Sequence, residues 1–212
     1  LWFGECVACK EFASKLKEEL LDEFEKLDVE NITYKTWVST DRTELLTVTE
    51  EVGEFVDSFV EKLEALKTHD FIYRQQACYF SELKDNLSED SCISVGDFSE
   101  NYTFLIQDAV QGNHWSKDQA TLHQFVGYAN VAGVVTMIPV LFISDHLTHD
   151  TVAVYAFQRR LNQLLDDMIG ERKKQYYFLD GCGKQYKNKK NFLNLTFHGD
   201  DFGPPADWSF FA

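Results

Sequence analysis

Two aspartates stand at the ends of short β-rich stretches and could hold a metal ion together. Asp97 lies in "SCISVGDF" (91–98), and Asp180 ends "KKQYYFLD" (173–180). Carboxylates that converge at strand ends suit hard cations such as Mg²⁺ or Mn²⁺. Two such ions about 4 Å apart can clamp the attacking and leaving oxygens of a phosphodiester. Taken singly, each aspartate could equally close a turn.

A lysine-rich stretch follows Asp180 directly. In "FLDGCGKQYKNKKNF" (178–192), Gly181 lets the backbone turn away from the aspartate, and four lysines come next: Lys184, Lys187, Lys189 and Lys190. We expect a helix here, and lysines in its first turn oppose the helix dipole unless an anion such as a phosphate lies in front of them. These lysines are therefore expected to contact a nucleic-acid backbone. The alternative is a solvent-exposed basic helix that balances the acidic first half of the chain.

Cysteine and histidine residues offer other ligands. "CVAC" (Cys6, Cys9) has the spacing of half a zinc site, whose other Zn²⁺ ligands would lie upstream, or it is a pair of ordinary cysteines. In "SDHLTHD" (144–150), two aspartates and two histidines could bind a transition metal and support a hydrolase, although Asp150 is expected to cap the following helix. His114 and His123 could lie near Asp97 if the second strand runs beside the first.

The composition indicates a globular protein that meets phosphate only locally. The 212 residues are 44% hydrophobic and 15% aromatic, which argues against disorder. The net charge is −15, and residues 1–95 carry 22 acidic against 10 basic side chains, so this is not a generally basic nucleic-acid binder. Five scattered cysteines favour a reducing compartment. No apolar run approaches the roughly 18 residues of a membrane span, and no membrane partner is expected.

Residues 1–90 are expected to be a helical N-terminal region. Apolar residues recur at three- and four-residue spacing in 10–27, from Thr47 to Leu66, and in 69–87. The first ten residues could be the end of a zinc- or DNA-binding module. Because the chain opens "LWFGEC" without a methionine and closes inside a predicted strand, we expect a piece of a longer protein.

Residues 91–212 are expected to form a mixed sheet with helices packed on it, an α/β (α+β) fold. The predicted elements are strands at 91–98, 121–129, 134–144, 173–180 and 206–212, and helices at 151–170 and up to about His198. The second and third of these strands are expected to form a hairpin, with Pro139 at an edge or bulge. The order β-β-β-α-β-α-β is the connectivity of an RNase H-like core. In that architecture Asp97 and Asp180 lie on neighbouring strands and face one pocket.

Four segments carry a resemblance to a known family: "VGDFSENYTFLIQDAVQGNHWSKDQATLH", "ISDHLTHDTVAVYAFQ", "FLDGCGKQYKNKKNFLNL" and "ADWSFFA". They resemble a family of mostly uncharacterised, transposon-derived animal proteins related to the DDE superfamily of transposases and integrases. The likeness covers roughly residues 69–212. It implies a metal-dependent phosphoryl-transfer core in which Asp97 and Asp180 match the first two acidic positions. The third acid of such cores follows the fifth strand, so we expect it beyond Ala212 and the fragment by itself to be inactive.

The resemblance also implies the partners and the alternatives. A working core would cleave DNA and transfer strands with two Mg²⁺ or Mn²⁺ ions, act in the nucleus, and could assemble as a homo-oligomer. A domesticated relative would have lost catalysis and would serve as a DNA- or protein-binding module. A hydrolase built on the His/Asp cluster at 145–150 is the third hypothesis.

Overall fold

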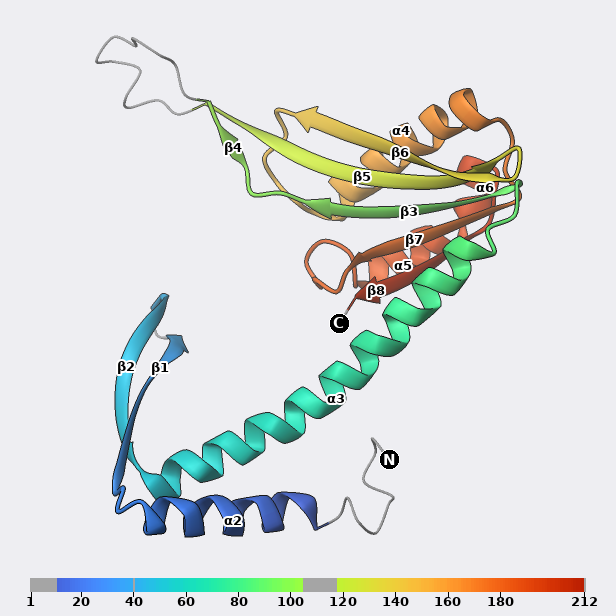
Figure 1. The fold of residues 1–212 in the computed structure, drawn as a ribbon. Helices are drawn as coiled ribbons and strands as arrows, with labels where there is room; N and C mark the ends of the chain where they lie inside the picture. The colour runs from blue at the N-terminus through green and yellow to red at the C-terminus, as the bar shows by residue number, and fades with distance from the viewer. Residues whose placement is uncertain (1–10, 40, 105–117, 212) are drawn as a thin grey trace. The chain divides into compact units, whose positions relative to one another are not determined.

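The computed structural model describes residues 11–39, 41–104 and 118–211 (Figure 1). The predictions for Cys6, Cys9 and His114 therefore lie outside the described residues. The chain divides into two compact units, Leu1–Gln75 and Gln76–Ala212. This division falls before the boundary expected at residue 90, because the last turns of a long helix belong to the second unit.

The first unit contains helix α2 (Phe12–Lys26), strands β1 (Asn31–Ser39) and β2 (Thr43–Glu51), and the greater part of helix α3 (Val52–Asp85). Helix α2 packs on α3 through Phe24 and Phe55, whose ring centroids are 6.5 Å apart. Tyr34 of the β1–β2 hairpin packs on the same Phe55 ring at 5.2 Å. These contacts hold two helices and a hairpin around one aromatic side chain.

The prediction of a helical region 1–90 was wrong over the hairpin. Residues 31–39 alternate between exposed and half-buried positions, the period of a strand with one covered face. The helix expected from Thr47 begins at Val52, because Thr47 is paired with Lys35 across the hairpin. Beyond that point the two helices expected at 47–66 and 69–87 are one continuous helix, α3.

The second unit is built on a mixed six-stranded sheet. Its strands are β3 (Ser91–Phe98), β4 (Tyr102–Thr103), β5 (Gln119–Val131), β6 (Val134–Ser144), β7 (Lys174–Asp180) and β8 (Ala206–Phe211). The five long strands lie in the order β6-β5-β3-β7-β8 (Figure 1); β5 is antiparallel to β6 and β3, and β7 is parallel to β3 and β8. The α+β class and the five predicted strands are confirmed.

The β5–β6 hairpin follows local chemistry. Its turn places Ala132 and Gly133 at positive φ (52° and 81°), the conformation that two-residue hairpin turns require. Pro139 lies in β6, which pairs only with β5 among the described strands, so the missing backbone N–H faces an open edge. The prediction that Pro139 occupies an edge strand is confirmed.

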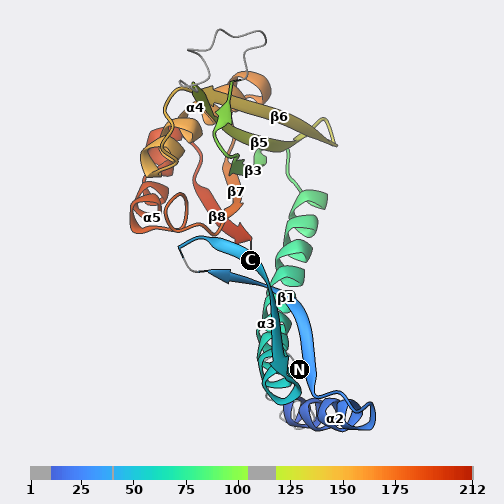
Figure 2. The same ribbon diagram turned by 90° about the vertical axis from the view of Figure 1, so that its left-hand side faces the viewer.

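Three helices cover one face of this sheet: α4 (Thr151–Ile169), α5 (Lys189–Thr196) and α6 (His198–Phe202), as Figure 2 shows. The predicted cap and stop of α4 are confirmed, since the Asp150 carboxylate accepts from two backbone N–H groups at 3.0 Å and Gly170 has a φ of 80°. Leu161 and Leu165 are fully buried, whereas Met168 is 55% exposed. Beneath α4 lies the main core.

The other face of the sheet carries a smaller cluster. Phe80 from the last turns of α3 packs on Phe178 and Tyr128, with ring centroids 5.0 and 5.9 Å apart, beside Ile93. The acidic pair lies further along this second face. In the part of the chain that the structure describes, no helix has the length and apolar character needed to cross a membrane.

A candidate metal and nucleic-acid site

Asp97 and Asp180 lie on the same face of the sheet, at the same end of two neighbouring parallel strands. In the β3–β7 register Val95 is paired with Phe178 and Gly96 with Leu179, so the next step along both strands brings Asp97 beside Asp180. Parallel neighbours in a sheet are about 4.8 Å apart at the backbone. The adjacency that we predicted for their strands is therefore confirmed.

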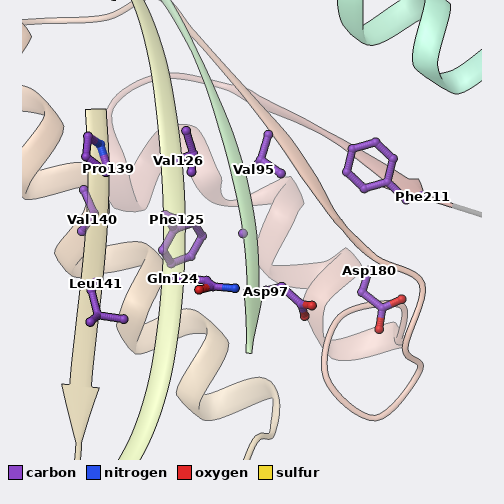
Figure 3. A pocket seen from close by; sticks show the side chains of 11 residues that line it. Val95, Asp97, Gln124, Phe125, Val126, Pro139, Val140, Leu141, Asp180 and Phe211 are labelled. Atoms are coloured by element: carbon purple, nitrogen blue, oxygen red, sulfur yellow. The ribbon is translucent and has the colours of Figure 1, made fainter. Parts of the chain in front are cut away.

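Both carboxylates line one pocket of about 710 Å³ (Figure 3). Its remaining walls are mostly apolar and include Val126, Leu141 and Phe211. Figure 3 shows the two carboxylates at one end of this pocket, with the apolar side chains of β5 and β6 at the other. A pocket with few, convergent polar groups in an apolar wall is typical of ligand sites.

The pair carries an electrostatic cost in the absence of a cation. Partial burial raises the pKa of the Asp97 carboxyl above its usual value, and the negative charge of Asp180 raises it further. The pKa of Tyr186 is raised by burial first and then by the charges of Asp97 and Asp180. The site thus concentrates negative charge, which a divalent cation would neutralise.

A buried aromatic layer supports the pair from the opposite face of the sheet. Phe98 follows Asp97 directly and stacks on Tyr186, with ring centroids 5.8 Å apart. The Tyr186 hydroxyl is hydrogen-bonded to His123 Nε2 at 3.1 Å, and both side chains are fully buried. His123 lies on the strand next to Asp97, as the sequence suggested. It is paired with Phe98, so its side chain belongs to this aromatic layer and not to the pocket.

Gly96 makes room for this layer. A Cβ atom at Gly96 would lie 2.4 Å from the ring of Phe125, its partner across the β3–β5 ladder. Phe125 is only 2% exposed, so its ring has little space to move. The glycine immediately before Asp97 therefore lets β5 pack closely against β3.

The lysines lie differently from our expectation. Helix α5 begins at Lys189, after Asn188 caps it by accepting from the backbone N–H groups of Lys190 and Asn191 at 3.1 Å. Lys184 and Lys187 precede the helix, in the loop that follows Asp180. The helix-dipole argument thus does not hold for these two lysines, and it holds for Lys189 and Lys190.

Three of the lysines line a second cavity of about 450 Å³, where the first turns of α4 and α5 meet. They are Lys184, Lys189 and Lys190. The Asn188 cap joins the two helices, because its Oδ1 also accepts from the Thr151 hydroxyl at 3.3 Å. None of these three lysines forms an ion pair with a described residue. Lys187 instead lies over the Phe210 ring at 5.7 Å.

Two members of the His/Asp cluster at 145–150, His149 and Asp150, have structural roles. Asp150 caps α4, and His149 Nε2 is hydrogen-bonded to Asn101 Oδ1 at 2.8 Å while its ring stacks on Phe98 at 4.4 Å. Within residues 11–39, 41–104 and 118–211 there is no group of three or more His, Cys, Asp or Glu side chains that could hold a metal ion.

Sequence reasoning missed two residues of the site. Gln124 is paired with Asp97 across the β3–β5 ladder and lines the pocket. Its position follows from the pairing register of β3 and β5. The alternation of apolar residues in "TLHQFVGYA" does not determine that register. Tyr186 was not considered, because the stretch was expected to be a helix that presents its lysines; the signal that could have found it is a lone aromatic residue among them.

Comparison with known families places the two units separately. Residues 76–212 match the family described as a domain of unknown function, DUF8701, and residues 1–67 match a second such family, DUF8700. The chain belongs to the DUF8701 family, whose match covers more than half of its length. The two matches agree with the two compact units.

Other comparisons add little. No curated protein matches this chain. A solved structure, the cryo-EM structure of the simian T-cell lymphotropic virus intasome in complex with the PP2A regulatory subunit B56 gamma, is similar over 69% of this chain, with 10% sequence identity and a TM-score of 0.30. The present chain covers 43% of the length of that matched chain.

Proposed function

We propose that this chain is the core of a transposase-like protein that cleaves and joins DNA phosphodiesters with Mg²⁺ or Mn²⁺. One observation carries the proposal: Asp97 and Asp180 lie side by side at the same end of two parallel strands, inside one pocket. The sheet order β6-β5-β3-β7-β8 supports it, because this is the order expected of an RNase H-like core.

The residues present fit a hard divalent cation. Mg²⁺ prefers oxygen ligands and is commonly held by one or two carboxylates, with water and substrate phosphate completing the octahedron. Asp97 and Asp180 supply such carboxylates, and both side chains are accessible to solvent. A bound ion would supply charge neutralisation at the phosphodiester and a more acidic attacking water.

The chain's own residues would orient the DNA. Lys184, Lys189 and Lys190, on the loop and helix that follow Asp180, line one cavity and form no ion pair with any residue that the structure describes. In an acidic chain, three lysines that form no ion pair with a described residue, on the segment that follows Asp180, favour a polyanionic ligand at this cavity. They would hold the backbone while Asp97 and Asp180 face the reacting phosphate.

Nicking of supercoiled DNA by the full-length protein tests the proposal. Cleavage that depends on Mg²⁺ or Mn²⁺ should fall by at least about 10²-fold in Asp97→Asn and in Asp180→Asn. Asp207→Asn is the matched control, since Asp207 lies towards the other end of the same sheet and is paired with Lys174 at 2.8 Å. Activity should also survive His146→Ala. Equal loss in Asp207→Asn, or cleavage that persists without Asp97, would contradict the proposal.

The runner-up is a DNA-binding module without catalysis, which the cavity lined by Lys184, Lys189 and Lys190 would support by itself. In this case the full-length protein binds DNA but does not cut it. Reversing the charge of Lys184, Lys189 and Lys190 should then weaken binding and lower its salt dependence, with Lys173→Glu as control. Lys173 forms its own ion pair with Asp90 at 2.9 Å.

A further inference from the structure

The pocket continues from the acidic pair along a single row of side chains on the sheet face. Asp97 is paired with Gln124 on β5, and Gln124 is paired with Leu141 on β6. The adjacent row on the same face contains Val95, Val126 and Pro139. The carboxylates thus lie at one end of an apolar floor, and Gln124 lies between the carboxylates and the apolar side chains (Figure 3).

This floor is open to solvent and carries one unused polar group. Leu141 is 54% exposed, although it lines the pocket. The Gln124 carboxamide is exposed as well and has no hydrogen-bond partner among the described residues. A carboxamide offers both a donor and an acceptor in one plane. The floor can therefore accept a flat apolar ligand whose edge is polar.

We propose that the β5–β6 side of this pocket binds the nucleoside next to the phosphate held at Asp97 and Asp180. The proposal rests on the function proposed above. Strand spacing of about 4.8 Å places Leu141 roughly 10 Å from Asp97, a distance that a sugar and base attached to that phosphate can span. The base would lie on Val126, Pro139 and Leu141, and Gln124 would hydrogen-bond its edge.

The pocket has the size and asymmetry that this ligand needs. Its volume of about 710 Å³ lies within the usual range for small-molecule sites. On the other side of the acidic pair the row continues to Phe211 on β8, which is paired with Asp180. The apolar floor on β5 and β6 therefore lies on the opposite side of the pair from β8.

Methyl NMR of the whole chain with thymidine 5′-monophosphate as the probe tests this inference. In Mg²⁺, the base should shift the methyl signals of Val126 and Leu141 by its ring current, and inorganic phosphate at the same concentration should not. Ile143, on the same face of β6 but outside the pocket and 66% exposed, should show no shift.

Matched variants separate the two proposals. Leu141→Ala and Gln124→Leu should each weaken nucleotide binding by about three- to tenfold, while leaving phosphate binding and the backbone spectrum unchanged. Ile143→Ala is the control and should bind like the parent chain. Mg²⁺-dependent binding of both probes at Asp97 without methyl shifts at Val126 and Leu141 would overturn the nucleoside subsite and leave the metal site intact. Binding of neither probe in Mg²⁺, or binding that Asp97→Asn does not alter, would overturn the proposed function itself.

Discussion

The hydroxyl of Tyr186 lies 3.1 Å from Nε2 of His123, and this contact anchors the lysine loop to the sheet. Tyr186 belongs to the segment between Asp180 and α5, whereas His123 belongs to β5. Both side chains are fully buried behind the acidic pair. The position of the loop after Asp180 thus depends on a hydrogen bond on the opposite face of the sheet.

Replacing Tyr186 by Phe should destabilise the chain by about 1–3 kcal/mol, because His123 Nε2 would lose its partner in a buried place where Nδ1 already lacks one among the described residues. Urea unfolding measures this loss. Tyr155→Phe is the matched control: its hydroxyl bonds to Asp201 at 3.1 Å in an exposed position, and its loss should cost under about 0.5 kcal/mol. Equal effects in the two variants would show that the buried bond does not hold the loop.

His123 should make stability depend on pH. Burial lowers its pKa to about 3, so the folded chain keeps this ring neutral while the unfolded chain binds a proton below about pH 6.5. The unfolded state then binds more protons between these values, and stability falls as pH decreases through the window. The slope from this residue is about 1.4 kcal/mol per pH unit.

Urea unfolding of His123→Gln between pH 4 and pH 7 checks that slope. The variant should lose this part of the pH dependence, whatever its stability at pH 7. Exposed His146, replaced in the same way, should leave the dependence unchanged. A variant slope equal to that of the parent chain would mean that His123 is not held neutral.

Gly96→Ala should cost about 1–3 kcal/mol or more, because the new methyl group would overlap the buried Phe125 ring. Gly127→Ala is the control on the neighbouring strand, where a Cβ would meet its nearest atoms at an ordinary 3.5 Å. Thermal unfolding of the two variants compares them directly. A Gly96→Ala chain as stable as the Gly127→Ala chain would contradict the close β3–β5 packing.

Asp97→Asn should stabilise the metal-free chain at neutral pH. Folding raises the pKa of the Asp97 carboxyl, chiefly by burial and then by the charge of Asp180. For such a group, stability is highest below the unfolded pKa and is lost as pH rises through the folded pKa. The gain in melting temperature should vanish near pH 3. A lower melting temperature of the variant at pH 7 would show that the ionised carboxylate stabilises the fold.

Local patterns in the sequence predicted the second unit better than the first. Strand β3 was placed at its observed bounds because "SCISVGDF" is short and β-rich, and Asp150 and Gly170 marked both ends of α4. The hairpin β1–β2 was missed because Val48 and Val52 have helical spacing, although Val48 pairs with Tyr34 across two strands. Residues four positions apart lie on one face of a helix and also on one face of a strand. Only the pairing with another strand therefore distinguishes the two structures here.

The candidate site was predictable as far as strand order determines it. Asp97 and Asp180 were placed together because parallel neighbours expose the same face at the same end. Gln124 could not be predicted in this way, because its place beside Asp97 depends on the β3–β5 register. The lysines were assigned to one helix, yet Asn188 starts that helix after Lys187.

Binding of Mn²⁺ to the chain, followed by the EPR signal of the free ion, tests the central claim most directly. The parent chain and Asp207→Asn should bind Mn²⁺ alike, and Asp97→Asn and Asp180→Asn should each raise the Kd at least about tenfold. The same Kd for all four chains, or no binding by the parent chain, would contradict a metal site shared by Asp97 and Asp180.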